Sequence, residues 1–357
     1  MAGSERADFE YDGRLVFNGI RETEVNSSDH EEMREELLSD LPEFERGSPN
    51  NKKRGFEEID LSGIAEAQNE TSTDGPILDE DLTALAEKIV DRKYIWESYA
   101  GTGDNVEFVN EEGDRTSAWI RSTDEAYVYW AYPDFMFVQG AQTRVEETEG
   151  RVNAALGEDA EVTDVSFDPD FLLWLLYKYD YADDGIPGAI SIDQLNSSEV
   201  QGDLEQYGHR GRVEDSTNIG ESLPIIAALL QEMDFRMMEG WFSLNGYSLK
   251  AEIQTTSRQV ESSRIHIKVE GAIDDAETYL KRALLGLMFV REFTDLYQEW
   301  RDEMDDTDKY PPFKFFDDLA GTAARNNVDL KFDVDDLIEE YEEKRGERAD
   351  PTEFDHL

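Results

Sequence analysis

The chain has 357 residues, of which 84 are Asp or Glu and 34 are Lys or Arg, so its formal net charge is −50. It contains no cysteine and only four histidines, which excludes disulfides and cysteine-based zinc sites and argues against a multi-histidine metal site. Molar salt shortens the Debye length to about 3 Å and screens the repulsion between like charges. The composition therefore predicts a cytoplasmic protein of an extreme halophile.

The sequence also argues against a membrane partner. No apolar run approaches the roughly 18 residues that span a bilayer. The N-terminal residues lack the basic and apolar regions of a secretory signal. We therefore expect a soluble protein.

Residues 1–78 mix acidic runs, at 29–36 and 57–60, with clusters such as Gly47-Ser-Pro-Asn-Asn. Segments with high net charge and little apolar surface do not fold alone. We therefore predict an acidic, mostly disordered extension here, with one short helix near residues 30–39. The alternative is that this acidic arm docks a protein partner or mimics nucleic acid.

A globular region of α+β type, in which helices pack on antiparallel sheets, is predicted over residues 79–302. Residues 79–100 carry Leu82, Leu85 and Ile89 at helical intervals and predict a helix. The apolar period then changes to two, and short segments between turns predict an antiparallel meander. Its predicted strands are residues 106–109, 117–121, 126–131 and 135–139.

Helices and strands alternate in the rest of this region, which has two candidate subdomains, 79–166 and 167–302. Asp168 and Pro169 fit the N-cap and first position of an apolar helix that extends to residue 181. Asn245-Gly246 predicts a hairpin turn. The other predicted helices are 143–156, 220–232 and 274–303, and the other strands are 162–167, 189–195, 235–244, 247–254 and 264–269. Residues 303–357 predict an acidic helical tail.

Acidic catalytic templates are weak evidence here, because so many carboxylates match them by chance. Pro133-Asp134 and Pro169-Asp170 resemble the first half of the PD-(D/E)xK nuclease pattern, whose carboxylates hold Mg²⁺. Lys250 and Lys268 stand in the reverse order to its second half. Phosphate-binding glycine motifs and the serine-hydrolase elbow are absent from the sequence. We therefore predict no catalytic residue, metal or cofactor.

Positive charge stands out in two places. The segment Tyr207-Gly-His-Arg-Gly-Arg212 is basic, and residues 235–291 hold 8 Lys and Arg against 7 Asp and Glu. Arginine binds phosphate through two parallel hydrogen bonds and stays charged. The alternative is that each base pairs with a neighbouring acid. The candidate nucleic-acid-binding residues are Arg144, Arg151, His209, Arg210, Arg212, Arg264 and Lys268.

The order of elements over residues 125–302 is distinctive. A strand leads to a helix that ends at Gly157, and Phe171-Leu-Leu-Trp-Leu-Leu-Tyr177 then opens an apolar helix. This order resembles the RdgC-like proteins, in which a phrase like F-L-x-W-L-W-[YF] begins a helix. The family's second Trp is Leu176 here, and residues 1–78 and those from Glu303 onward have no counterpart.

The resemblance implies a non-enzymatic, sequence-independent DNA-binding protein of recombination, which forms ring-shaped dimers with a positive inner surface. We therefore predict a DNA-maintenance protein whose partners are DNA and a second copy of the chain. Two alternatives stay open. One is a viral or defence-related scaffold that binds proteins through its acidic arms. The other is a metal-dependent nuclease with three or more acids beside Lys250 or Lys268.

Overall fold

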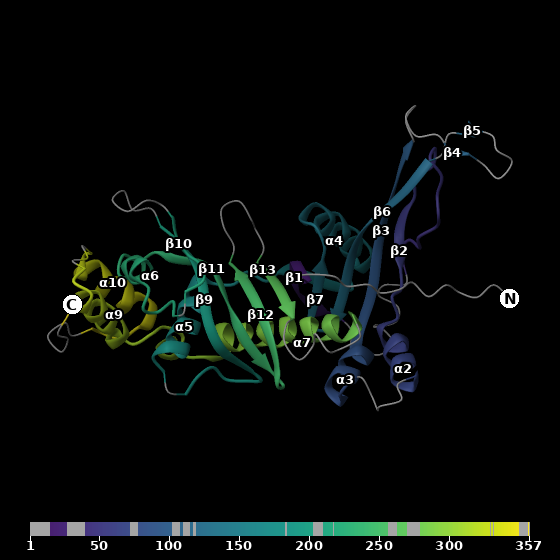
Figure 1. Ribbon diagram of the computed structural model, residues 1–357. Helices are drawn as coiled ribbons and strands as arrows, with labels where there is room; N and C mark the ends of the chain where they lie inside the picture. Colours follow the sequence, from purple (N-terminus) through teal and green to yellow (C-terminus); the bar gives the residue numbers. More distant parts are fainter. Residues whose placement is uncertain are drawn as a thin grey trace. The chain divides into compact units, whose positions relative to one another are not determined.

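The computed structural model in Figure 1 has the predicted α+β fold, in which helices pack on antiparallel sheets. It describes residues 15–26, 40–71, 78–101, 108–109, 115–116, 119–182, 184–202, 210–216, 218–255, 263–269, 279–328, 330, 332–349 and 356. The described chain divides into two compact units. Unit 1 runs from Val16 to Asp164, and unit 2 consists of Leu15 and the residues from Val165 onward.

Unit 1 is built on an antiparallel sheet with the strand order β1-β7-β6-β3-β2, and β8 also pairs with β1. These strands are β1 (Leu15–Val25), β2 (Arg54–Glu57), β3 (Ile89–Gly101), β6 (Trp119–Ala131), β7 (Phe135–Gln139) and β8 (Ala160–Asp164). Two short strands, β4 (Phe108–Val109) and β5 (Arg115–Thr116), pair with each other. The helices are α2 (Leu61–Thr71), α3 (Glu80–Lys88) and α4 (Gln142–Leu156). Helix α4 buries Val145 and Val152 in one core with Trp130 of the sheet.

The helix predicted over residues 79–100 is wrong in its second half. It ends at Lys88, and Ile89 begins β3. Strand β3 pairs with β6 along its whole length, from the Ile89–Ala131 pair to the Gly101–Trp119 pair. The many β-branched and aromatic residues of this segment fit a pleated surface better than a helix.

The disordered extension predicted over residues 1–78 does not hold for residues 15–26 and 40–71, which are folded. Phe17 and Ile20 of β1 are buried, and β1 lies between β7 and β8. Asp91 of β3 accepts hydrogen bonds from the backbone N–H groups of residues 59, 60 and 61 at 2.9, 2.9 and 3.0 Å, and so fixes the start of α2. These segments fold because they complete a sheet made by later residues. The rest of the predicted extension, with its helix at 30–39, lies outside the described residues.

Unit 2 is built on a second antiparallel arrangement of strands, in the order β10-β9-β11-β12-β13. They are β9 (Ile190–Gln201), β10 (Arg210–Val213), β11 (Asp234–Leu244), β12 (Tyr247–Gln254) and β13 (Arg264–Val269). The predicted hairpin joins β11 to β12, and both Asn245 and Gly246 have positive φ, at 49° and 83°. Positive φ at both central residues is the requirement of a type I′ turn.

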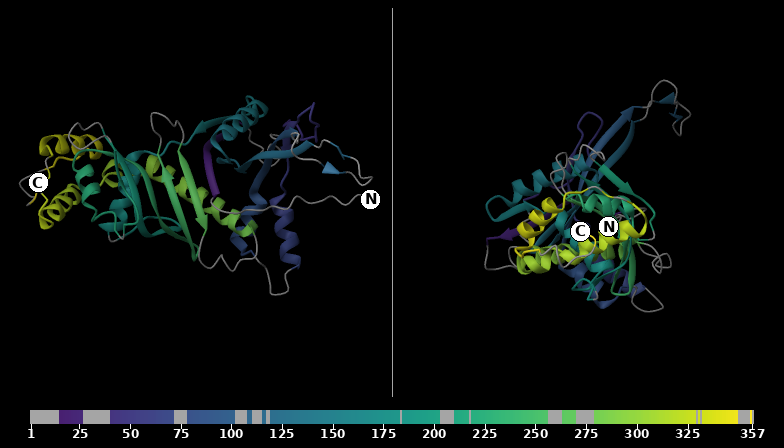
Figure 2. Two further views of the ribbon diagram at one scale, coloured as in Figure 1. Left: turned by 45° about the horizontal axis from the view of Figure 1, so that its top comes forward. Right: turned by 90° about the vertical axis from the view of Figure 1, so that its left-hand side faces the viewer.

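Helices α5 and α7 of unit 2 pack on one face of these strands. Helix α7 crosses the strands β11–β13 in Figures 1 and 2, and its Phe289 and Phe293 rings lie 5.3 and 6.4 Å from the ring of Phe242 on β11. The side chain of Asp168 caps α5, as predicted, by accepting from the backbone N–H of Asp170 at 2.9 Å. The helices are α5 (Pro169–Asp180), α6 (Leu223–Leu229), α7 (Tyr279–Gln298), the π-helical turn η1 (Glu299–Glu303), α8 (Asp306–Lys309), α9 (Phe313–Arg325) and α10 (Val334–Arg345).

The residues predicted as an acidic helical tail are helical, but α9 and α10 belong to the folded core of unit 2. Phe315 and Phe316 are each 2 % exposed, and the Phe315 ring packs 4.8 Å from that of Tyr181 after α5. Their aromatic side chains supply the apolar area that the acidic residues around them do not. Among the described residues, no helix is long and apolar enough to span a bilayer.

Candidate nucleic-acid interface

The strands of unit 2 have one apolar and one polar face. Strand alternation places Phe242, Ala251 and Ile267 on the face that packs against α7. The residues between them point to the other side of the strands. We call this side the polar face. Its residues are Arg210 and Arg212 (β10), Ser197 and Glu199 (β9), Glu239 and Trp241 (β11), Lys250, Glu252 and Gln254 (β12), and Arg264 and His266 (β13).

The two arginines of β10 stand over a buried carboxylate. The Glu199 side chain is 10 % exposed, whereas those of Arg210 and Arg212 are 63 % and 50 % exposed. Arg210 donates to Glu199, and Arg212 Nη1 lies 3.9 Å from the same carboxylate. Arg212 Nε also lies 2.7 Å from Glu214, just beyond the strand. The Glu199 carboxylate therefore lies beneath the two guanidinium groups, which face the solvent.

The other carboxylates of the polar face are held in the same way. Glu239 accepts from Lys250 Nζ at 2.9 Å and from Ser197 Oγ at 3.3 Å. Glu252 lies 3.2 Å from His266 Nδ1 and accepts from the amide of Gln254 at 2.7 Å. Buried charges need such partners, because removing a carboxylate from water is costly.

The polar face is nearly neutral in a protein with a net charge of −50. Among its described side chains, four cations, from Arg210, Arg212, Lys250 and Arg264, stand against three carboxylates, and Glu214 and Asp193 lie at its borders. Arg264 Nε and His266 Nε2 are buried and have no hydrogen-bond partner. Arg264 Nε is a donor, so it adds an unpaired donor to this side of the strands.

The structure brings some of the predicted site residues together and separates others. Arg210 and Arg212 lie side by side on β10, and Arg264 lies on the same face of β13, four strands and about 19 Å away at the usual strand spacing. Lys268 is opposite Lys250 in the register, which places it on this face, but its side chain is outside the described part. His209 lies outside the described residues.

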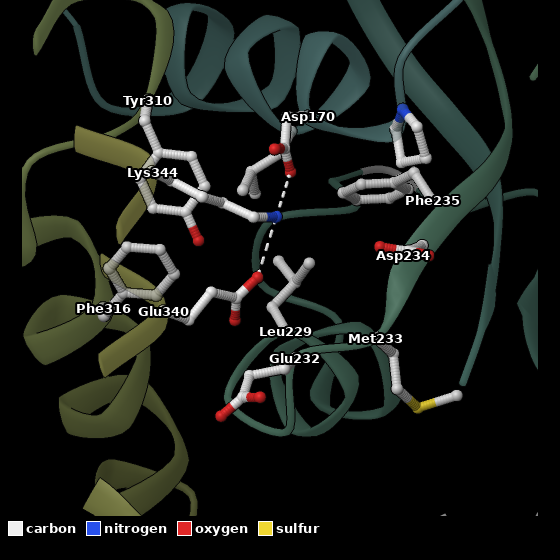
Figure 3. Close-up of a pocket in the computed structure, with 12 residues that line it drawn as sticks. Asp170, Leu229, Glu232, Met233, Asp234, Phe235, Tyr310, Phe316, Glu340 and Lys344 are labelled. Atoms are coloured by element: carbon white, nitrogen blue, oxygen red, sulfur yellow. Dashed lines mark hydrogen bonds and ion pairs between the residues drawn. The ribbon is translucent and has the colours of Figure 1, made fainter. Parts of the chain in front are cut away.

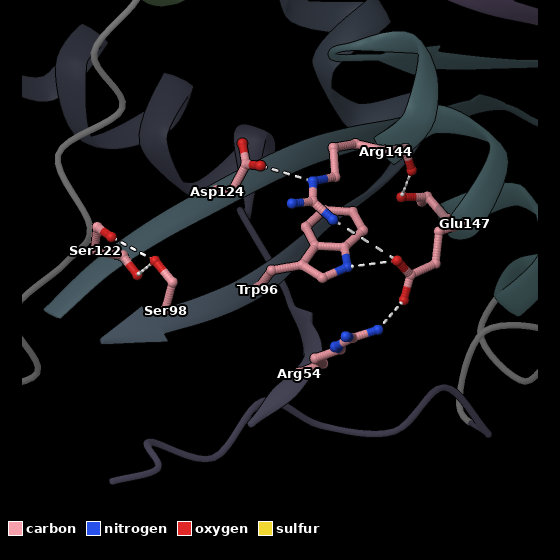
Figure 4. A network of polar contacts seen from close by, with 8 residues as sticks. Arg54, Trp96, Ser98, Ser122, Asp124, Arg144 and Glu147 are labelled. Carbon is pink, nitrogen blue, oxygen red and sulfur yellow. Dashed lines mark hydrogen bonds and ion pairs between the residues drawn. The ribbon is translucent and has the colours of Figure 1, made fainter. Parts of the chain in front are cut away.

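The remaining candidates, Arg144 and Arg151, are on α4 of unit 1 and form a separate group. The Arg144 guanidinium lies 4.8 Å from the centre of the Trp96 ring, and its Nε donates to Asp124 at 2.6 Å. Figure 4 shows that Glu147 joins this network, since it accepts from the Trp96 indole at 2.9 Å and from Arg54 at 2.6 Å. The Arg144 guanidinium group thus stacks on Trp96 and donates a hydrogen bond to Asp124. This favours the alternative in which bases are paired with neighbouring acids.

Sequence reasoning missed Trp241 and the buried acids Glu199 and Glu239. A sequence signal for the polar face was nevertheless present in β12, where Lys250, Glu252 and Gln254 alternate with apolar residues. The matching alternation in β13 predicts a second strand with one polar face. What the alternation does not reveal is which strands pair, and therefore which polar side chains meet.

A second polar cluster in unit 2 surrounds Lys344 of α10, in the shallow pocket of Figure 3. Its Nζ donates to Asp170 of α5 at 2.7 Å and lies 2.8 Å from Glu340. Burial acts to lower the pKa of Lys344, but these two carboxylates outweigh it and hold that pKa above its ordinary value. The cluster fastens α10 to α5.

The acids that a nuclease needs are not assembled in the described part of the chain. Asp170, from the second Pro-Asp pair, is bound to Lys344 instead of lying beside Lys250. Among the described residues, no group of three or more His, Asp or Glu side chains is placed to hold a metal ion.

No protein-family model matches this chain, and no curated protein matches it either. The resemblance to the RdgC-like proteins stays a prediction from the order of elements. The function proposed below therefore rests mainly on the charges and distances of the polar face.

Proposed function

We propose that this protein is a non-enzymatic, sequence-independent DNA-binding protein and that the polar face of unit 2 is its binding surface. The observation that supports this proposal is made at β10, where the exposed guanidinium groups of Arg210 and Arg212 cover the buried carboxylate of Glu199. Exposed guanidinium groups bind phosphate through paired, charge-assisted hydrogen bonds. Contacts to phosphate carry no direct sequence information, so a surface of this kind binds DNA of any sequence.

The number of cations suits a protein that works at high salt. Each phosphate neutralised adds about −0.9 to the slope of log K against log salt concentration on duplex DNA, and about −0.7 on single strands. The four cations of the polar face therefore correspond to a slope of about −3 to −4, well below that of a strongly basic protein. Affinity in molar salt must then depend more on hydrogen bonds and stacking. The resemblance to RdgC-like proteins supports a role in recombination and a dimeric state.

The test is the double variant Arg210→Glu/Arg212→Glu, measured by fluorescence anisotropy with a labelled oligonucleotide in molar KCl. We expect at least tenfold weaker binding, because two phosphate-binding groups become repulsive. The matched control is Arg301→Glu/Arg325→Glu, which makes the same charge change on η1 and α9 of unit 2. Wild-type affinity in the β10 variant would refute the proposal. Equal losses in both variants would also count against it, since net charge alone would then explain them.

A further inference from the structure

The proposed DNA-binding face has a tryptophan at its centre. Trp241 lies on β11, the middle strand of the five, and its cross-strand neighbours are Lys250 on one side and Gln194 on the other. We propose that the ligand of this face is single-stranded DNA and that Trp241 is the platform on which an unpaired base stacks. This inference rests on the proposed function and adds the substrate class to it.

Trp241 differs from most tryptophans of this protein. Four of the six belong to the core, since they are almost completely buried: Trp96 (4 % exposed), Trp130 (0 %), Trp174 (1 %) and Trp300 (5 %). Trp241 is only half-buried and stands among charged and amide side chains. No aromatic contact to another described ring involves it, whereas Trp174 and Trp300 both pack on Phe171. None of the described aromatic rings therefore stacks on the Trp241 indole, part of which is exposed.

The shape of the polar face favours a single strand over a duplex. Five strands at the usual spacing span about 19 Å, whereas the major groove of B-DNA is about 12 Å wide, so this face does not enter the groove. A duplex also keeps its base faces stacked inside, where an indole cannot reach them. A single strand exposes its base faces, and open sheets with a central aromatic residue bind such strands by stacking.

Arginines lie on the polar face to both sides of Trp241. Trp241 is two strands from β10, which carries Arg210 and Arg212, and two strands from β13, which carries Arg264. A base on the central indole therefore leaves its backbone free to run toward either edge. Stacking does not release counterions, so this contribution persists in molar salt, where charge attraction weakens.

The test compares Trp241→Ala with Trp241→Phe on two probes, an oligo(dT) of about 20 nucleotides and a duplex of the same length. We expect the wild type to bind the single strand more tightly than the duplex. Trp241→Ala should weaken single-strand binding about tenfold, which corresponds to about 1.4 kcal/mol. Trp241→Phe should lose less than about threefold, because phenylalanine still offers a stacking face. The matched control is Trp119→Ala on β6 of unit 1, whose side chain is 57 % exposed, and it should bind like the wild type.

A second readout keeps the inference falsifiable if Trp241→Ala folds poorly. Stacking quenches indole fluorescence, so oligo(dT) should quench the wild type and should not quench Trp241→Phe, although that variant still binds. Unchanged quenching in Trp241→Phe, or a duplex that binds as tightly as the single strand, would overturn the inference. If Arg210→Glu/Arg212→Glu still weakens binding in that case, the proposed function survives. If the wild type binds neither probe, both this inference and the proposed function are refuted.

Discussion

Asp180 is a half-buried carboxylate that forms no ion pair with a described Lys or Arg. It is the last residue of α5, and its Oδ2 is buried and has no hydrogen-bond partner. Its pKa is raised from an ordinary 3.8 to about 6, chiefly by burial; the backbone N–H of Gly220 acts to lower this pKa and the neighbouring Glu221 acts to raise it. The carboxylate also lies at the helix C-terminus, where negative charge is unfavourable.

We predict that Asp180→Asn stabilises the protein above neutral pH. The folded-state pKa is raised, so Asp180 favours folding below pH 4 and this contribution is lost as the pH rises through about 6. A pKa difference of about two between the folded and unfolded states corresponds to about 3 kcal/mol in the free energy of unfolding. Because the group is partly exposed and the solvent is salty, we expect a gain of about 1–2 kcal/mol in the free energy of unfolding, or about 1–3 °C in the melting temperature.

The assay is thermal unfolding followed by circular dichroism in constant molar KCl, at pH 8 and again at about pH 4.5. Asparagine stays neutral, so the gain should be complete at pH 8 and fall to about a third at pH 4.5, where an unfolded Asp with the ordinary pKa of 3.8 is still mostly ionised. The control is Glu343→Gln, which removes the same charge from an exposed position on α10 and should change the melting temperature by less than about 1 °C. An equal effect of Asp180→Asn at both pH values, or a loss of stability at pH 8, would show that the carboxylate is not strained by burial.

Two further substitutions test the contacts that hold each unit together. Lys344→Met should lower the free energy of unfolding by about 2–3 kcal/mol in urea at constant KCl, because it leaves Asp170 and Glu340 facing each other without the cation. An unchanged urea midpoint would contradict this. Asp91→Ala leaves the backbone N–H groups at the start of α2 without their acceptor, which costs about 2–3 kcal/mol. Limited proteolysis should then cut first within residues 40–71, and cleavage elsewhere would argue against this anchoring role.

Elements whose signals lie within a few residues were predicted well. The hairpin at Asn245-Gly246 depends on two residues that accept positive φ, and both adopt it. The start of α5 depends on a cap and a proline, and Asp168 caps the helix as expected. Such local preferences act before any tertiary contact is made, so they are visible in the sequence.

Two segments whose strand partners are distant in the sequence were not predicted as strands. Residues 89–101 have helical spacing at their start, but they become β3 because a strand about 30 residues later pairs with all of them. Residues 15–25 have a composition that suggested disorder, yet they form β1 between β7 and β8. Pairing across such distances is decided by burial in the whole unit, which overrides local propensity.

The sequence by itself determined the charge excess, the α+β class and the places where acid gives way to base. Only the tertiary structure decided how those bases are used. It placed Glu199 beneath Arg210 and Arg212, and it held Arg144 against Trp96 in the other unit. The physical reason is that a charge acts on what lies within a few ångströms, and these neighbours come from separate strands and helices that meet only when the chain folds.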